Sequence, residues 1–453
     1  SWDAPLIYTT NVQLLETLFG GGTRGARRMH QLANAVIVFD EIQTLPINCV
    51  HLFNNAINFL IEQCGSTVVL CTATQPLLNN VDRDRGALHL AAENELMPNV
   101  RQLFDDLKRV DIVNGRKPGG WTNDEIAELA MRECVRATSC LVVVNTKASA
   151  LALYFLCKQQ RNVAVVHLST SMCPAHRKRI LNFIRHRLRW NKPTLCVSTQ
   201  LIEAGVDVDF GAVVRFEAGL DSIAQAAGRC NRNGMRAIGV VHVVNPAQEN
   251  LSMLADIRVG RDKARRVLDD YEKNPEKFGN NRIGPEAMKW YYENYFFARS
   301  GEMSYSLSAK TSGRDDSLLN LLSSNTYATS EHFSRHGRNP ASPLHHAFMS
   351  AASEFKAIDA PTRGVIVPYG KKGKKLVADL CAAFDVEKQF NLLRQAQQYT
   401  VNVFPNVFAA LADASALNPI QEGVDILCLD ARFYSPEFGL VTEPVQPMEV
   451  LVS

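Results

Sequence analysis

Apolar runs and helical patterns alternate along the first part of the chain. The run VIVF at 36–39 is continuous and β-branched, which is typical of a parallel strand buried on both faces. A helical pattern follows at 47–64, and a second strand, TVVLCTAT, is predicted at 67–74. The stretch GRKPGG at 115–120 is typical of a linker. We therefore predict a short first α/β domain at 1–117.

A second alternating series fills the next part of the chain. TNDE at 122–125 predicts a capping box that opens a helix. Strands are predicted at 140–144, 162–167, 194–197, 212–216 and 239–244, with helices at 148–160, 174–190 and 221–228. Because strands that alternate with helices form a doubly wound parallel sheet, we predict a second α/β domain at 118–250.

The last 200 residues are less regular. Residues 251–340 are predicted to form a helical linker whose second, Ser-rich half is a loop or flexible segment. Residues 341–453 predict a small mixed α/β domain with a hairpin (GVIVPY-GKKGKK-LVADL), a helix at 386–398 and the strand DILCLD. The aromatic stretch WYYENYFF at 290–297 could stack on bases, but we favour a helix packed between domains.

Composition narrows the class of protein. The 453 residues are 46% hydrophobic and 21% charged, which excludes a disordered or collagen-like chain. No apolar stretch approaches the ~18 residues that cross a bilayer, and no signal peptide is visible. The eleven scattered cysteines lack any C-x-x-C pair, which predicts reduced thiols in a cytoplasmic protein without zinc. The start at Ser1 suggests a partial protein.

A net charge of +3 does not decide between nucleic acid and other partners, so the distribution of charge along the chain has to be considered. Seven Lys/Arg and no acid occur between Arg177 and Lys192, a pattern that fits a solvated helix face and a nucleic-acid contact about equally. Four lysines at 371–375 lie in the predicted hairpin turn, where we expect them to aid solubility.

An acidic pair follows the first apolar strand directly. Asp40-Glu41-Ile42-Gln43 begins where VIVF ends, at the edge where doubly wound sheets bind ligands. In hydrolysis of a nucleoside triphosphate, one acid can hold Mg²⁺ and the other can polarise the attacking water. A solvated acidic turn is the alternative. The next strand ends in Thr72-Ala73-Thr74, whose hydroxyls could link this acidic site to a neighbouring domain.

The second α/β domain contributes two further polar segments. Thr199 begins T-x-x-x-x-x-G-x-D, and Gln225 begins Q-x-x-G-R-x-x-R, which ends at Arg232. Two arginines three residues apart on one short helix, Arg229 and Arg232, would project to the same side and offer planar donors to phosphate. An exposed helix face is the alternative.

The order and spacing of these four segments resemble motifs II, III, V and VI of superfamily 2 helicases. Five stretches resemble, in their residues, the CRISPR-associated helicase-nuclease of type I systems. They are CTATQP, QLIEAGVDVDF, GLDSIAQAAGRCNRNG, TTNVQLLETLF and HLSTSMCPAHRKRI. The likeness is close over roughly residues 5–245 and looser beyond. It implies two tandem RecA-like domains, the first truncated, plus a helical linker and a small C-terminal mixed α/β domain.

The resemblance also implies roles for individual residues. Asp40 would hold the Mg²⁺ of Mg-ATP, Glu41 would position or deprotonate the water, and Gln43 would couple hydrolysis to domain motion together with Thr72 and Thr74. Gln225 would lie close to the γ-phosphate and the attacking water. The remaining implied residues bind nucleotide (Gly205, Asp207, Gly228), reach the γ-phosphate as finger residues (Arg229, Arg232) or touch phosphates of single-stranded DNA (Thr10, Ser169, Thr199).

The sequence departs from that family in two respects. The glycine-rich stretch at 20–25 is followed by Ala26 and Arg27 instead of Lys and Ser/Thr, so we interpret it as a surface loop and not as a P-loop. The chain also contains no His-Asp dipeptide, so nuclease activity is not assigned to it. We therefore expect the C-terminal part of the enzyme, without its nuclease domain and the first half of its first RecA-like domain.

As a whole, the resemblance implies an ATP-dependent translocase that moves 3′ to 5′ on single-stranded DNA. Its implied partners are the Cascade surveillance complex with guide RNA, which recruits it to unwind and degrade invading DNA, and the missing N-terminal nuclease and P-loop portion; no membrane is involved. Two alternatives stay open. One is another superfamily 2 translocase, and the other is a catalytically silent fragment that binds DNA and docks onto Cascade.

Overall fold

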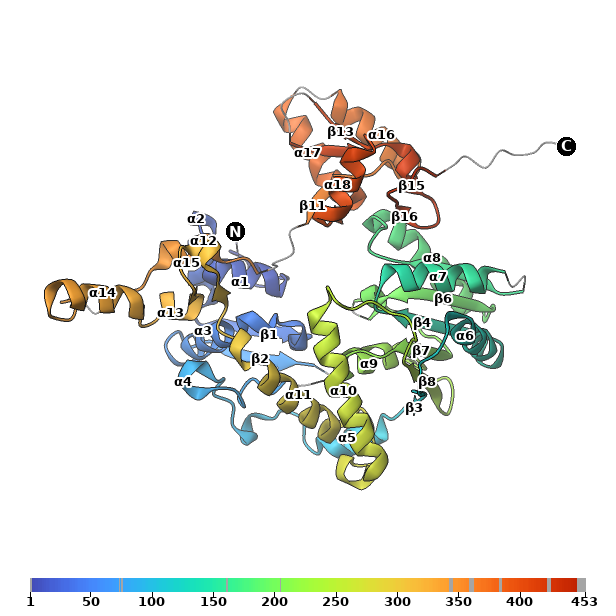
Figure 1. The fold of residues 1–453 in the computed structure, drawn as a ribbon, viewed down its shortest axis with the longest axis horizontal. Helices are drawn as coiled ribbons and strands as arrows, with labels where there is room; N and C mark the ends of the chain where they lie inside the picture. The colour runs from blue at the N-terminus through green and yellow to red at the C-terminus, as the bar shows by residue number, and fades with distance from the viewer. Residues whose placement is uncertain are drawn as a thin grey trace. The chain divides into compact units, whose positions relative to one another are not determined.

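A computed structural model describes residues 2–72, 74, 76–159, 162–203, 205–341, 345–357, 362–382, 385–421 and 425–445. The chain divides into two compact units, each made of two segments. Unit 1 contains residues 1–105 and 269–359, and unit 2 contains residues 106–268 and 360–453. Figure 1 colours the chain along its length, so the two segments of each unit can be followed.

A six-stranded parallel sheet forms the centre of unit 2 (Figure 1). Its order is β3 (Val110–Asn114), β8 (Gly239–Val244), β7 (Ala212–Phe216), β4 (Ser139–Val144), β6 (Thr194–Thr199) and β5 (Ala164–Leu168). The helices between the strands are α6 (Asn123–Ala137), α7 (Lys147–Lys158), α8 (Pro174–Arg189) and α9 (Leu220–Ala227). The predicted capping box at Thr122 opens α6.

Helices cover both faces of this sheet. Val142 and Val144 of β4 pack with α6 and α7 in one core, whereas Leu141 and Val143, which point to the opposite face, are also fully buried. Helices α8 and α9 contact β5, β6 and β7. The α/β fold class predicted from the alternating pattern, a doubly wound parallel sheet, is therefore confirmed.

The last segment of unit 2 carries a smaller mixed sheet in the order β12 (Thr400–Val403), β11 (Arg363–Ile366), β14 (Leu427–Leu429), β13 (Leu417–Pro419), with helices α16 (Gly370–Cys381), α17 (Val386–Ala396) and α18 (Pro405–Asp413). The predicted hairpin here is wrong. The lysine-rich stretch belongs to α16, because Gly373, Leu376 and Leu380 recur at helical spacing and are buried.

Unit 1 contains a two-stranded parallel sheet of β1 (Val36–Asp40) and β2 (Thr67–Cys71). Helix α3 (Val50–Glu62) packs beside it, and Phe39 makes edge-on contact with Phe53 of that helix. The expectation that β1 is buried on both faces is wrong: Phe39 is buried, but Val36 is 72% and Val38 59% exposed. Within the described residues, no further strand or helix covers that side of β1.

The other elements of unit 1 are short helices and two-residue strands. They are α1 (Asn11–Phe19), α2 (Thr23–Met29), α4 (Arg83–Gly86), α11 (Pro285–Arg299), β9 (Ser306–Leu307), α12 (Ala309–Ser312), β10 (Asp316–Ser317), α13 (Leu318–Leu321), α14 (Thr326–His336) and α15 (Phe348–Glu354). Two further helices, α5 (Val100–Asp106) and α10 (Ala255–Lys273), cross the points where the chain passes between units. The glycine-rich loop predicted at 20–25 ends at Gly22, where α2 begins.

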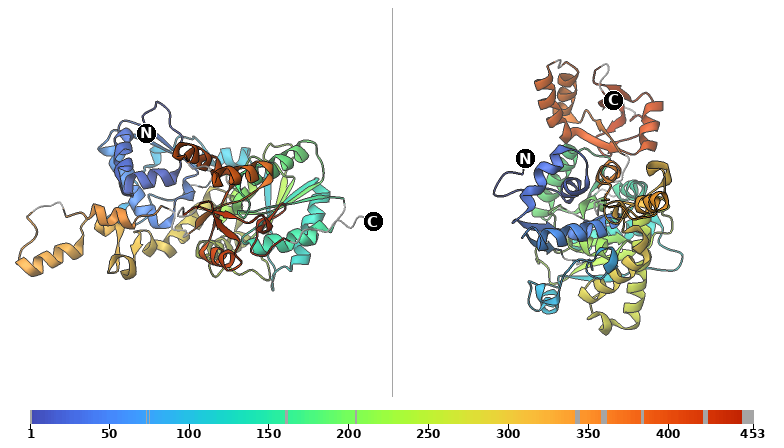
Figure 2. Two further views of the ribbon diagram at one scale, coloured as in Figure 1. Left: turned by 90° about the horizontal axis from the view of Figure 1, so that it is seen from above. Right: turned by 90° about the vertical axis from the view of Figure 1, so that its left-hand side faces the viewer.

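Several predicted boundaries need correction. Strand β3 pairs with β8 of the six-stranded sheet, so residues 106–117 belong to unit 2. GRKPGG is therefore a loop inside unit 2 rather than a linker between domains. The predicted linker at 251–340 lies mostly in unit 1. Its Ser-rich half contains helix α14, which Figures 1 and 2 show projecting from the rest of unit 1.

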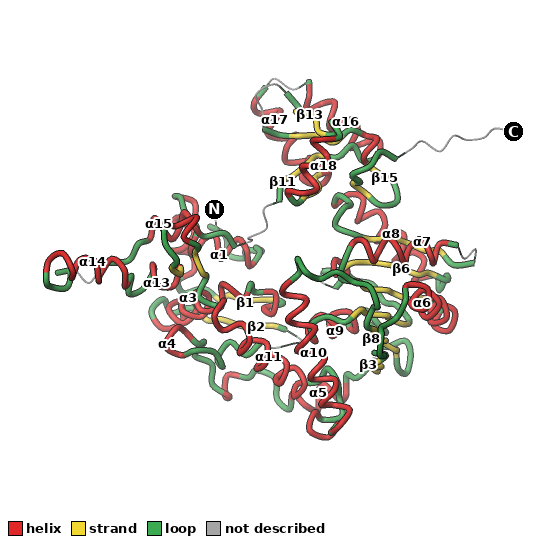
Figure 3. Tube along the Cα trace, in the orientation of Figure 1, coloured by secondary structure: helices red, strands yellow, loops and turns green. Residues whose placement is uncertain are grey.

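In α11, Tyr291, Tyr292 and Phe296 are buried, as the packing interpretation of this aromatic stretch requires. Figure 3 distinguishes the helices, strands and loops of the described residues by colour. None of the described helices has the length and apolar character needed to cross a bilayer. All eleven cysteines are free thiols, and among described residues no His, Cys, Asp and Glu side chains cluster as metal ligands.

Candidate nucleotide and DNA site

The acidic turn in unit 1 lies at the carboxyl end of β1. Asp40 is the last residue of that strand and is exposed. Glu41 adopts a left-handed backbone conformation with φ of 56°, which costs on the order of 1 kcal/mol or more in a non-glycine residue. The Thr44 hydroxyl and amide both donate to the Glu41 carbonyl, at 2.8 and 3.0 Å, and so hold this turn.

Gln43 connects the acidic turn to the end of β2. Its side-chain amide donates to a Glu41 carboxylate oxygen at 2.5 Å, and its amide oxygen accepts from the Thr72 hydroxyl. The Thr74 amide in turn donates to the Thr72 hydroxyl oxygen at 3.0 Å. Asp40 pairs with Cys71, which precedes Thr72. The structure thus brings together all five residues predicted from motifs II and III.

Thr10 lies elsewhere in unit 1, at the start of α1. Its hydroxyl oxygen accepts from the Gln13 amide at 3.1 Å and caps the helix, while the side chain stays exposed. The predicted DNA contact is therefore accessible, next to the amide groups at a helix N-terminus.

In unit 2, the loop after β6 carries the motif V residues. Gly205 is exposed and left-handed, with φ of +66° and open space around it, a conformation that favours glycine. Asp207 is 82% exposed and pairs with the Arg232 guanidinium at 3.1 Å. Gln225 is half-buried on α9, and Gly228 caps the end of that helix.

The expectation that Arg229 and Arg232 project to the same side of one helix is wrong. Helix α9 ends at Ala227, so both arginines lie in the turn beyond it. Arg229 is only 7% exposed, and its guanidinium donates to the carbonyls of Ile202 at 3.0 Å and Glu203 at 2.5 Å. Arg232 instead points to solvent beside Asp207. The two side chains therefore diverge, and Arg229 ties the motif VI turn to the motif V loop.

Two residues that the motif analysis did not single out shape this turn. The Asp209 carboxylate accepts from the Arg232 amide at 2.8 Å and the Asn233 amide at 3.1 Å. Asn231, left-handed at φ 48°, donates its side-chain amide to the Arg236 carbonyl at 2.8 Å. The Asn231 contact is local and of a type that Asn commonly makes in turns. The Asp209 contacts reach 23 and 24 residues along the chain, so no local sequence signal predicts them.

A buried ion pair lies under the motif V loop. Arg215 of β7 is fully buried, and its Nε lies 2.9 Å from a Glu203 carboxylate oxygen. The Ser222 hydroxyl on α9 accepts from Arg215 at 2.8 Å and donates to Glu203 at 2.7 Å. The only sequence signal for this pair is a single charged residue inside the apolar strand AVVRF.

The polar cluster continues along the carboxyl edge of the sheet. Asn145, which follows β4, accepts from Arg215 at 2.7 Å and donates to Glu249 at 2.9 Å. Glu217, which follows β7, is bound by Arg265 at 3.0 Å. Burial raises the pKa of the Glu203 and Glu249 carboxyls, with opposing contributions from Arg215 and Asn145. The loops at this edge are therefore held by buried charge as well as by backbone.

Two predicted DNA contacts in unit 2 are not accessible. Ser169 is 1% and Thr199 8% exposed, so neither hydroxyl can reach DNA as it lies. The loop after Ser169 is covered by a hairpin of β15 (Tyr434–Ser435) and β16 (Gly439–Leu440). The Leu440 amide donates to the Ser171 carbonyl at 2.8 Å, and the Cys173 amide donates to the Tyr434 hydroxyl at 3.1 Å.

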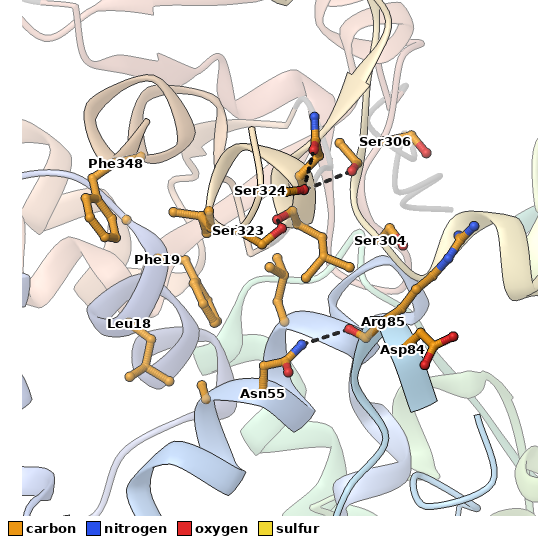
Figure 4. Close-up of a pocket in the computed structure, with 18 of the residues that line it drawn as sticks. Leu18, Phe19, Asn55, Asp84, Arg85, Ser304, Ser306, Ser323, Ser324 and Phe348 are labelled. Atoms are coloured by element: carbon orange, nitrogen blue, oxygen red, sulfur yellow. Dashed lines mark hydrogen bonds between the residues drawn. The ribbon is translucent and has the colours of Figure 1, made fainter. Parts of the chain in front are cut away.

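Unit 1 also contains a cavity of about 890 Å³ (Figure 4). Leu18 and Phe19 of α1, Asn55 of α3 and Phe348 of α15 line one side, and a group of serines at 304–324 lines the other. The Asn55 amide donates to the Arg85 carbonyl at 2.9 Å. None of the site residues implied by the resemblance lines it, so the cavity is separate from the acidic turn.

Comparisons with known proteins point in one direction. Residues 136–235 match the family described as CRISPR-associated nuclease/helicase Cas3, C-terminal. The chain is 25% identical over 337 residues to the CRISPR-associated nuclease/helicase Cas3 of Haloferax volcanii, covering 55% of this chain and 36% of that protein. It is 25% identical over 210 residues to the Cas3 of Methanothermobacter thermautotrophicus, covering 44% and 24%.

Solved structures resemble the fold. The crystal structure of T. fusca Cas3 matches with a TM-score of 0.58 at 15% identity, over 93% of this chain and 54% of that one. A chain of a CRISPR RNA-guided surveillance complex in a pre-nicking state matches with a TM-score of 0.54 at 16% identity, over 95% and 60%. This chain thus spans about half of these structures and a smaller share of the curated relatives. The resemblance stated from the motifs is confirmed, and the chain is a relative of the CRISPR-associated helicase-nucleases of the Cas3 type.

Proposed function

We propose that this chain is the ATP-dependent motor part of a type I CRISPR interference helicase-nuclease. It would move along single-stranded DNA in the cytoplasm, recruited by Cascade and its guide RNA to unwind and degrade invading DNA. Sequence similarity to the Cas3 relatives supports the class of enzyme. The exposed cations of α8, which are Lys178, Arg179, Arg185 and Arg189, support a nucleic-acid partner, as does the accessible Thr10.

The connection from Glu41 through Gln43 to Thr72 is the observation that carries the proposal. The Gln43 amide donates to one group and accepts from the other, so any shift of the Glu41 carboxylate changes the geometry at Thr72. Thr72 in turn holds the Thr74 amide. A change in the hydrogen bonding of Glu41 during hydrolysis would therefore reach the end of β2, which is the coupling that a translocase needs.

The residues present fit Mg-ATP at the acidic turn. Asp40 offers an exposed carboxylate, a ligand type that Mg²⁺ prefers, and Glu41 offers a second carboxylate that could accept a proton from water. Mg-ATP, when bound, supplies the phosphoanhydride bond that is hydrolysed. Unit 2 carries the other residues that the resemblance assigns to the nucleotide. Arg232 would donate to phosphate, joined by Arg229 once it leaves the Ile202 and Glu203 carbonyls. Gln225 would lie by the γ-phosphate and the attacking water, and Gly205, Asp207 and Gly228 would face the nucleotide.

ATP hydrolysis with and without single-stranded DNA tests this proposal. In the complete protein, which would include the missing P-loop portion, we expect DNA-stimulated turnover that falls about 10²–10⁴-fold in Glu41→Gln, because a general base of this kind contributes that much. Gln43→Ala should keep basal hydrolysis within a few-fold while losing the stimulation by DNA. Glu93→Gln removes an exposed carboxylate of unit 1 outside the acidic turn and should match the unaltered chain. Stimulation that survives both Glu41→Gln and Gln43→Ala would contradict the proposed site.

One rival function rests on a specific observation. The sequence contains no G-x-x-x-x-G-K-[ST] stretch, which favours a catalytically silent module that binds DNA and docks onto Cascade. Salt-sensitive DNA binding and capture by Cascade, without nucleotide binding, would support that module. Another superfamily 2 translocase is the weaker rival, because both curated relatives are Cas3 proteins; a chain that Cascade does not capture would favour it.

A further inference from the structure

Helix α8 presents a strongly basic surface in unit 2. Between Arg177 and Lys192 the sequence has seven Lys/Arg and no acid. The helix is anchored to the protein by Ile184, which is fully buried, and by contacts with β5 and β6. Its opposite side faces solvent, and the residues there can be sorted by helical spacing.

The exposed side of α8 begins with a polar and basic stripe. Its members lie at intervals of four, three and four residues, which places them on one face of a helix, and all four are exposed: Lys178, Asn182, Arg185 and Arg189. At 1.5 Å per residue, the stripe spans about 16 Å, enough for two or three nucleotides of an extended strand.

A second stripe, with two aromatic rings, runs beside the first. Arg179, Phe183 and Trp190 follow the same helical spacing, and Phe183 is 48% and Trp190 64% exposed. The Arg187 guanidinium lies 5.7 Å from the centre of the Phe183 ring. The centres of the His186 and Trp190 rings are 6.3 Å apart, so each aromatic ring has one neighbouring side chain beside it. Both rings therefore leave about half of their surface open to a partner, beside the cations of the first stripe.

Two of the arginines on α8 form hydrogen bonds with other parts of unit 2. Arg187 donates to the Thr194 hydroxyl and the Pro193 carbonyl, and Arg185 donates to the Asp207 carbonyl at 3.0 Å. The carboxylate of Asp207 pairs with Arg232. Among the described residues, no carboxylate forms an ion pair with the other three exposed cations: Lys178, Arg179 and Arg189. Their charge is available to a partner.

We propose that the exposed face of α8 binds a single-stranded polynucleotide, with phosphates on Lys178, Arg179 and Arg189 and unpaired bases on Phe183 and Trp190. Cations alone would fit any polyanion, but open aromatic rings beside them match a strand whose bases are free to stack. A duplex hides its bases, and an acidic peptide has no need of the rings. The proposal does not depend on ATP hydrolysis, and it adds to the proposed function a surface that lies outside motifs II, III, V and VI.

Binding of fluorescent oligo(dT) to the full chain without nucleotide tests the proposal. Lys178→Gln/Arg179→Gln/Arg189→Gln removes three phosphate contacts, so the slope of log K against log salt should fall by about 2. The same slope predicts binding about 100-fold weaker at 0.1 M salt. Phe183→Ala/Trp190→Ala should weaken binding roughly 5- to 150-fold per lost stack without changing the slope.

A matched control removes three charges from another exposed helix of unit 2. Lys371→Gln/Lys372→Gln/Lys375→Gln on α16 should bind oligo(dT) like the unaltered chain. Thermal unfolding of each variant checks that the fold is intact. Unchanged affinity and slope in the α8 cation variant, or an equal loss in the α16 variant, would overturn the proposal.

The choice of nucleic acid separates the remaining outcomes. Tighter binding of oligo(dT) than of duplex DNA supports a single-stranded partner, and oligo(rU) used beside it shows whether DNA or RNA is the better ligand. Equal binding of the duplex would overturn the stacking role of Phe183 and Trp190. Loss of hydrolysis with α8-dependent binding intact would refute the proposed motor but leave this surface in place.

Discussion

At the scale of single residues, buried charge has more influence on this molecule than the motifs suggest. Arg215 bonds to groups from β4, β7, α9 and the motif V loop. Each of these bonds satisfies a polar atom that burial would otherwise leave costly. Arg215 and Glu203 together therefore hold the motif V loop against the helix that carries Gln225.

Replacing one member of this pair should be far more harmful than replacing both. Arg215→Met leaves the Glu203 carboxylate buried without its partner, and we expect the free energy of unfolding to drop by about 3–5 kcal/mol. Arg215→Met/Glu203→Met should recover part of that loss, since no charge is left buried. Denaturant unfolding of the three proteins measures this. A single variant within about 1 kcal/mol of the unaltered chain would show that the pair is dispensable.

At the scale of elements, the β15–β16 hairpin fastens the C-terminal segment onto the large sheet. Phe438 at its tip contacts Tyr154 and His167, with ring centres 5.5 and 5.8 Å apart. The Lys158 ammonium pairs with Glu437 at 2.7 Å. Gly439 lies so close to the Ser171 backbone that a Cβ there would be 2.3 Å from the Ser171 carbonyl oxygen.

Gly439→Ala should therefore detach the hairpin from the Ser169–Cys173 loop. Gly370 is the matched control, because it has a similar φ of +64° against +82° but open space around its Cβ position. We expect Gly370→Ala to cost about 1–2 kcal/mol from backbone strain alone and Gly439→Ala to cost more. Hydrogen exchange at residues 169–173 should rise only in Gly439→Ala. Equal exchange in the two variants would mean that the hairpin does not hold this loop.

At the scale of the whole molecule, each unit is assembled from two distant stretches of chain. Unit 2 contains two buried histidines, His167 of β5 and His176 of α8. Desolvation lowers the pKa of both side chains to about 4. Burial is the largest cause of that value, and the charge of His176 acts in the same direction on His167, as the charge of Arg179 does on His176. Tyr434 lies 3.0 Å from His176, so this region joins the two segments of the unit.

Unit 2 should consequently lose stability in mild acid. The unfolded chain protonates these histidines near pH 6.5 and the folded chain only near pH 4, so the free energy of unfolding falls as the pH drops through that window. Two such groups give a slope of up to about 3 kcal/mol per pH unit. His176→Gln should reduce this slope, and the exposed His336→Gln should not. Unfolding curves measured from pH 4 to 7 check both, and a slope unaffected by His176→Gln would contradict the assignment.

The sequence by itself determined the local elements and the identity of the motifs. Strands β4, β6, β7 and β8 are readable because each is mostly an apolar run, and buried parallel strands need apolar residues on both faces. The capping box at Thr122 and the proline-led start of α8 are likewise local signals. The grouping of Asp40, Glu41 and Gln43 with Thr72 followed from motif order, since adjacent parallel strands end at one edge.

Only the tertiary structure decided which groups those elements meet. The pairing of β3 with β8 joins residues more than 120 positions apart, and no local pattern specifies such a partner. Arg229 turns inward because the Ile202 and Glu203 carbonyls lie within its reach, whereas Arg232 turns outward to Asp207. Ser169 is buried near a hairpin some 270 residues later. Side-chain direction and exposure depend on contacts between distant segments, and a periodic pattern contains no information about those contacts.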